Sequence, residues 1–124
     1  MSEQNKININ YLSTLVLQES ENDAIQQIDS NLYNSISEFL KNLKNEKHDG
    51  IEEKIKQTMI DMISNTTSTL LKLRLEKATL ENSNQSVLLD EEKYILDSRA
   101  EMEERRGTIL AGILNGKPHS LDAQ

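Results

Sequence analysis

Residues 51–80 read IEEKIKQTMIDMISNTTSTLLKLRLEKATL, and their apolar spacing decides the fold of this chain. Apolar side chains recur three or four residues apart almost without a break, which predicts one long helix that reaches about Glu81. At 1.5 Å per residue this helix would be about 45 Å long, too long for one small domain to cover. The polar run at 64–69 forms helix poorly, which would allow a bend there. The pattern consists of Ile51, Ile55, Met59, Met62, Ile63, Leu70, Leu73 and Leu80.

Two shorter helices are expected before this segment. The apolar cluster at 11–16 has helical spacing and precedes the polar stretch QESEND, so it predicts a helix of about three turns. The triplet Asp29-Ser30-Asn31 predicts the start of the second helix, because Asp29 or Ser30 can accept free backbone N–H groups of the following turn. This helix is expected to stop at 48–50. Its apolar face consists of Leu32, Ile36, Phe39, Leu40 and Leu43.

A last helix of about 25 residues is expected after the polar loop at 81–86. Its start is indicated by Asp90, Glu91 and Glu92, since acidic side chains suit a helix N-terminus. It should end near Gly116. The sequence therefore predicts an all-α fold, a four-helix arrangement with two short N-terminal helices followed by two long antiparallel helices.

Composition narrows the class of protein further. The 124 residues suffice for one domain, and a hydrophobic content of 35% can form a modest core. Aromatic residues make up only 3%, with four Gly and one Pro, a poor supply for the turns and cross-strand pairs of an all-β fold. The formal net charge of -7 argues against a surface that condenses onto duplex DNA, since that binding relies on Lys and Arg.

Cysteine usage and the N-terminus bear on location. The chain has no cysteine, which excludes disulfides and thiolate chemistry and favours an intracellular protein. The N-terminal MSEQNKININ lacks the basic and apolar regions of a signal peptide. No uncharged apolar run approaches the roughly 20 residues that a membrane span requires. We therefore expect a soluble protein with no membrane association.

Catalytic and metal-binding patterns are sparse. The two histidines, His48 and His119, stand before Gly50 and after Pro118 and have no ligand spacing. Glu101-x-x-Glu104 places two carboxylates on one helical face, as in Mg²⁺-dependent all-α nucleotide pyrophosphatases. Those enzymes need a second acidic pair on a neighbouring helix, and this pair is missing from the expected downstream position. A solvated helix face is therefore the favoured interpretation.

Basic residues near the ends of the two long helices raise the question of DNA contact. If these helices are antiparallel, their basic side chains could form a strip that touches DNA or an acidic partner. Acidic residues are interleaved with the strip, and aromatic stacking platforms are absent, so intersubunit or surface ion pairs are favoured. The strip would comprise Lys72, Arg74, Lys77, Arg99, Arg105 and Arg106.

With the helices placed, the chain resembles the helical domain of a GINS subunit over about residues 10–118. The resemblance begins at IQQIDSNLYNSISEFLKNL (25–43), continues through the long helix with its Leu-Arg-Leu, and closes at LLDEEKYILDSRAEMEERRGTILAGILNGKP (88–118). The chain departs from the family pattern at Leu32, where an aromatic residue is common, and no proline follows Asp29. The small β domain of the family is also missing.

The resemblance implies a function. GINS accompanies the MCM helicase in DNA replication, so we expect a non-enzymatic scaffold subunit without cofactors, bridging MCM and a RecJ-like partner within a GINS homo- or heterotetramer. DNA contact would be indirect or weak at most, and an archaeal protein would lie in the cytoplasm or nucleoid. Residues 1–118 would form the GINS-like helical domain, and 119–124 a disordered tail or the start of a linker to the absent β domain.

The long helices supply the candidate site residues. A GINS-like subunit buries excess apolar helix surface against neighbouring chains, so seven apolar residues are predicted core or intersubunit contacts. A generic homo-oligomeric helical interaction module is the alternative, and a Mg²⁺-dependent nucleotide pyrophosphatase is the least favoured one. The seven residues are Ile55, Met59, Met62, Leu70, Leu73, Ile109 and Ile113.

Overall fold

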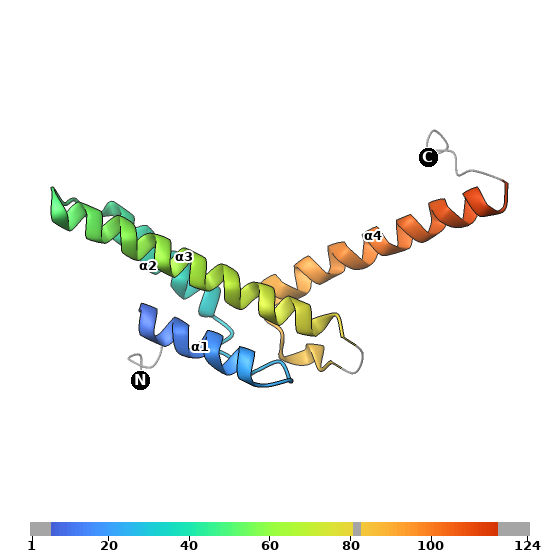
Figure 1. The fold of residues 1–124 in the computed structure, drawn as a ribbon, viewed down its shortest axis with the longest axis horizontal. Helices are drawn as coiled ribbons and strands as arrows, with labels where there is room; N and C mark the ends of the chain where they lie inside the picture. The colour runs from blue at the N-terminus through green and yellow to red at the C-terminus, as the bar shows by residue number, and fades with distance from the viewer. Residues whose placement is uncertain (1–5, 81–82, 117–124) are drawn as a thin grey trace. The chain divides into compact units, whose positions relative to one another are not determined.

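The structure of the chain is a computed structural model, and it describes residues 6–80 and 83–116. These residues form an all-helical fold with two short α-helices followed by two long ones (Figure 1), as the sequence predicts. The elements are α1 (Ile9–Glu21), α2 (Leu32–Asn45), α3 (Ile51–Ala78), a short 3-10 helix η2 (Gln85–Val87) and α4 (Asp90–Leu114).

The chain divides into two compact units. The first ends at Leu89 and holds α1, α2, α3 and η2, whereas the second begins at Asp90 and holds α4. The antiparallel arrangement of the two long helices, which belong to different units, stays a prediction. The tail predicted at 119–124 lies outside the described residues.

Short polar side chains lie at the starts of the two short helices, and one of them caps α1. The side chain of Asn8 accepts a hydrogen bond from the backbone N–H of Tyr11 at 2.8 Å, which caps α1. Asp29 accepts one from the backbone N–H of Asn31 at 2.9 Å, in the turn that leads into α2. Asn31 is the residue before α2, which begins at Leu32 and has no side-chain cap, so the predicted capping of this helix by Asp29 or Ser30 is wrong.

The turn between α2 and α3 is closed by a lysine. α2 ends at Asn45, a few residues before the predicted stop, and Gly50 takes a positive φ of 61° immediately before α3. Lys56 of α3 is almost fully buried and donates a hydrogen bond to the carbonyl oxygen of Glu46 at 2.8 Å. Its positive charge thus meets the C-terminal end of α2, where a helix favours a cation.

α3 runs through the polar stretch without interruption. Residues 64–69 are helical, and the hydroxyl of Thr69 donates to the carbonyl oxygen of Asn65 at 3.0 Å within the helix. Figure 1 shows α3 as one continuous helix. It ends at Ala78, three residues before the predicted end, which lies within the expected error of helix boundaries.

The hydrophobic core of the first unit lies on one face of α3. Along this face α1 runs in the same direction as α3 and α2 in the opposite direction (Figure 1). Leu12 of α1 and Ile63 and Leu70 of α3 are fully buried. The segment after η2 returns to this core through Leu89. The core cluster is Ile7, Leu12, Leu32, Ile36, Ile63, Leu70 and Leu89.

Candidate functional site

A buried ion cluster joins α1 to the C-terminal half of α3. Glu19 and Arg74 have fully buried side chains (0% exposed) and form an ion pair at 3.1 Å. Lys77, one turn further along α3, binds the other carboxylate oxygen of Glu19 at 2.8 Å. Burial of charge costs several kcal/mol per ion unless partners and hydrogen bonds compensate for it, so this cluster has to be well satisfied.

The two cations of the cluster also bind backbone carbonyls. The Arg74 guanidinium donates to the carbonyl oxygens of Gln26 at 2.6 Å and Val87 at 3.2 Å. Lys77 donates to the carbonyl oxygen of Ala24 at 2.9 Å. The cluster therefore fastens the segment between α1 and α2, as well as η2, to α3. Its role in the described structure is to stabilise the fold.

The cluster corrects the sequence interpretation of the basic residues. Arg74 and Lys77 were expected in a surface strip or in surface or intersubunit ion pairs, but Arg74 is buried and both pair with Glu19 inside the chain. Lys72, by contrast, is exposed. On α4, Arg106 pairs with Glu103 one turn away. Arg74 is thus not available to DNA or to a partner.

The seven predicted contact residues fall into different environments. Leu70 is fully buried in the core, so it is a core residue. Leu73 and Ile109 are half-buried. The remaining four are exposed and do not fill the core: Ile55, Met59, Met62 and Ile113.

A second apolar stripe runs along α3 beside its core face. At about 100° per residue, Ile55, Met62 and Leu73 lie within about 20° of one another around the helix. Ile51, Ile55, Met59 and Met62 of this stripe are between 38% and 75% exposed. We call the set Ile51, Ile55, Met59, Met62 and Leu73 the α3 stripe. Four of them also line a groove of about 300 Å³ beside Ile9 of α1, whose lining is Ile9, Ile51, Lys54, Ile55, Thr58, Met59 and Met62.

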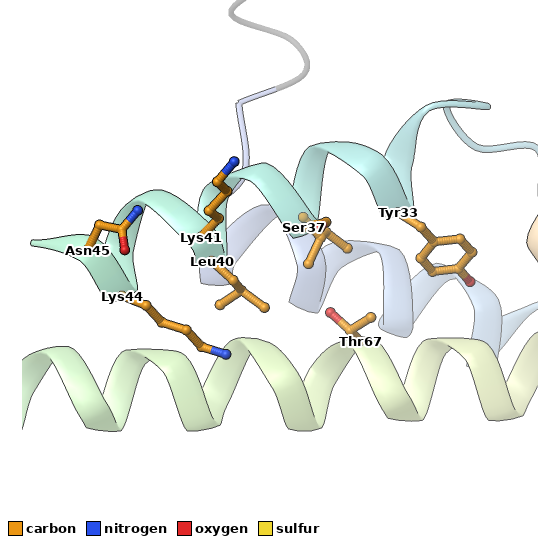
Figure 2. Close-up of a pocket in the computed structure, with 8 residues that line it drawn as sticks. Tyr33, Ser37, Leu40, Lys41, Lys44, Asn45 and Thr67 are labelled. Atoms are coloured by element: carbon orange, nitrogen blue, oxygen red, sulfur yellow. The ribbon is translucent and has the colours of Figure 1, made fainter.

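A larger groove lies between α2 and α3 and has a volume of about 570 Å³ (Figure 2). Its apolar lining is provided by Ile36, Leu40 and the ring of Tyr33. Polar and positively charged side chains complete it. We call this feature the α2–α3 groove, and it is lined by Tyr33, Ile36, Ser37, Leu40, Lys41, Lys44, Asn45 and Thr67.

The hydroxyl of Thr67 is buried in this region and has no hydrogen-bond partner within the described part of the chain. Figure 2 shows it pointing from α3 toward α2. A buried polar group without a partner costs about 1–3 kcal/mol. Thr67→Val removes the hydroxyl and keeps the shape and the β-branch, so we expect the free energy of unfolding to stay the same or to rise by about 1 kcal/mol.

Urea denaturation followed by circular dichroism measures this change. Thr69→Val is the matched control, because the Thr69 hydroxyl already donates to the Asn65 carbonyl and its removal should stabilise nothing. A clear loss of stability in Thr67→Val would contradict the assignment of an unpaired hydroxyl.

The second unit contains the helix α4. Its first turn contains the predicted acidic residues Asp90, Glu91 and Glu92, and the side chain of Glu92 is fully buried. Large apolar side chains are exposed along the rest of the helix. These are Tyr94, Ile95, Met102, Leu110, Ile113 and Leu114.

Glu101, Glu104 and His48 are not among the residues that line the α2–α3 groove or the groove beside Ile9. Glu101 and Glu104 are exposed on α4. Across 6–80 and 83–116, no three His, Cys, Asp or Glu side chains gather as ligands of a metal ion would. His48 contacts the Glu46 carboxylate at 3.1 Å, and His119 lies outside the described residues.

One carboxyl group near the α2–α3 turn has a shifted pKa. Hydrogen bonds from Gln57 and then Lys56 lower the pKa of Glu53 below its ordinary value. Glu53 is therefore held in its charged form, which supports Lys56 in its position at the end of α2.

Comparison of the chain with family models, with curated proteins and with solved structures finds no match. Of the helices in the described residues, none has both the length and the apolarity that crossing a membrane requires.

Proposed function

We propose that this protein is a non-enzymatic scaffold subunit of a GINS-like replicative helicase assembly. The resemblance over residues 10–118 and the order of two short and two long helices support this proposal. The observation that carries it is the α3 stripe, because an apolar face left largely exposed on a long helix is typical of a subunit interface.

The described structure explains how such a subunit would work. α3 uses one face for the core of its own unit and offers the neighbouring α3 stripe to a sister subunit in a homo- or heterotetramer. The buried Glu19–Arg74 pair fastens α1 to α3, so the stripe is presented on a firmly held helix. The subunit would then hold MCM and a RecJ-like protein in fixed relative positions, in the cytoplasm or nucleoid of an archaeal cell. DNA contact would be indirect.

The same stripe would also serve the alternative, a homo-oligomeric interaction module without a link to replication. Partner identity separates the two functions. Affinity purification of the tagged protein from its native host, followed by mass spectrometry, should recover MCM together with a second GINS-like chain or a RecJ-like protein. Recovery of this chain alone would overturn the replication assignment and favour the homo-oligomer.

We expect Ile55→Glu combined with Met62→Glu to reduce the oligomeric mass of the protein while its helicity is kept. Both side chains are about half exposed, so the fold tolerates the carboxylates, but an apolar interface would have to bury them without partners. Light scattering after size-exclusion chromatography measures the mass, and circular dichroism the helicity.

The matched control is Ser64→Glu, which adds a carboxylate to an exposed position of the same helix about 180° away from Ile55. It should leave the mass unchanged. An unchanged mass in the Ile55→Glu/Met62→Glu variant would remove the α3 stripe from the interface. Ile109→Asp, which introduces a carboxylate on α4, applies the same test to that helix.

A further inference from the structure

The α2–α3 groove has a chemical character that differs from the rest of the chain. The formal net charge of the protein is -7, yet the eight residues that line this groove include two lysines and no Asp or Glu. The stripe side of α3 is apolar, whereas this groove combines apolar, hydroxyl, amide and ammonium groups. It is therefore a distinct surface, on the other flank of the core face.

The two lysines are exposed and lie one turn apart on α2. Neither Lys41 nor Lys44 takes part in an ion pair within residues 6–80 and 83–116. Figure 2 shows the side chain of Lys44 reaching from α2 toward α3, and that of Lys41 on the outer side of α2. The two ammonium groups therefore point to different sides of the groove, so they can bind carboxylates on the two flanks of a bound segment.

The lining between the lysines and the core is suited to an aliphatic side chain. Leu40 and the Tyr33 ring are half-buried and Ile36 is buried, which gives the groove an apolar base. An aliphatic group flanked by carboxylates complements the apolar base and the two lysines.

We propose that the α2–α3 groove binds an acidic amphipathic segment of a partner protein. Aliphatic side chains of the segment lie against Leu40 and Tyr33, and its carboxylates pair with Lys41 and Lys44. Charge complementarity identifies the partner's chemistry, because an apolar segment without acidic groups would leave both lysines unused. This proposal is independent of the replication assignment, since it uses a groove that the α3 stripe does not share.

The test titrates the isotope-labelled full chain with a helical peptide that has Leu on one face and Glu on its flanks. We expect amide chemical shifts to change for 33–45 and around Thr67, and the affinity to fall as salt is raised. A peptide with Gln in place of every Glu should bind at least about tenfold more weakly. Absence of binding by the Glu peptide overturns the proposal.

Variants locate the binding. Lys41→Glu/Lys44→Glu should lower the affinity for the Glu peptide at least about tenfold, since attraction becomes repulsion at two positions. Lys72→Glu/Lys93→Glu makes the same change in net charge at exposed positions outside the groove and should leave the affinity unchanged. Equal loss in both variants would reveal a nonspecific charge effect and overturn the proposal. The proposal is also overturned if single-stranded DNA changes the amide chemical shifts of the groove residues as strongly as the Glu peptide does.

Discussion

The Arg74→Met variant should lose about 3–5 kcal/mol of unfolding free energy, the range for breaking a buried ion pair by removing one partner. Arg74 is fully buried against Glu19 and also donates to the carbonyl oxygens of Gln26 and Val87. Methionine keeps part of the apolar stem but leaves these acceptors without their donor. Lys77 continues to pair with Glu19, which limits the loss. Urea denaturation followed by circular dichroism measures it.

Two further variants define the origin of this effect. Lys72→Met removes an exposed cation from the same helix and should change the stability by less than about 0.5 kcal/mol. Combining Glu19→Met with Arg74→Met removes both buried charges, so the double variant should be more stable than the sum of the single losses implies. A loss below about 1 kcal/mol in Arg74→Met would contradict the fastening role of the cluster.

Local sequence signals were sufficient to predict the helices. The apolar spacing that begins at Leu32 marks α2, although the predicted side-chain cap is not formed there, and the acidic residues from Asp90 begin α4. The end of α2 was placed too late because the polar stretch after Asn45 contains no strong stop before Gly50. Start and stop signals of this kind act within one turn and are therefore visible in the sequence.

The two faces of α3 were harder to separate. The sequence interpretation merged all apolar residues of 51–80 into one pattern, although they form two neighbouring stripes. Ile63 and Leu70 belong to the core face, whereas Ile55 and Met62 belong to the exposed α3 stripe. Periodicity alone does not say which stripe α1 and α2 cover, because that choice depends on packing between distant segments. Core and interface candidates were therefore grouped together.

The ion cluster was missed for a similar reason. Glu19 lies in a polar stretch that marks a helix end, 55 positions before Arg74, and nothing local joins them. A signal was nevertheless present on α3. Arg74 follows Ile63 and Leu70 at core spacing, so a cation occupies a position where the pattern calls for an apolar residue. Such a residue predicts a buried partner, even when the partner is not identified.

The division of α3 into a core face and an exposed stripe leads to our second large prediction. Leu70 is fully buried in the core, and truncation at such a site removes apolar contacts and leaves a cavity. We expect Leu70→Ala to lose about 3–5 kcal/mol of unfolding free energy. Leu73→Ala, one turn further on and only half-buried, should lose about 1–2 kcal/mol when measured on the dissociated protein.

The same pair separates core from interface when oligomeric mass is measured alongside stability. Leu70→Ala should shift the denaturation midpoint at every protein concentration, because Leu70 stabilises the chain itself. Leu73→Ala should shift it further at concentrations where subunits are associated, since the part of Leu73 that only the oligomer buries contributes by mass action. Equal, concentration-independent losses in both variants would mean that Leu73 acts within its own chain, and that the α3 stripe ends before this residue.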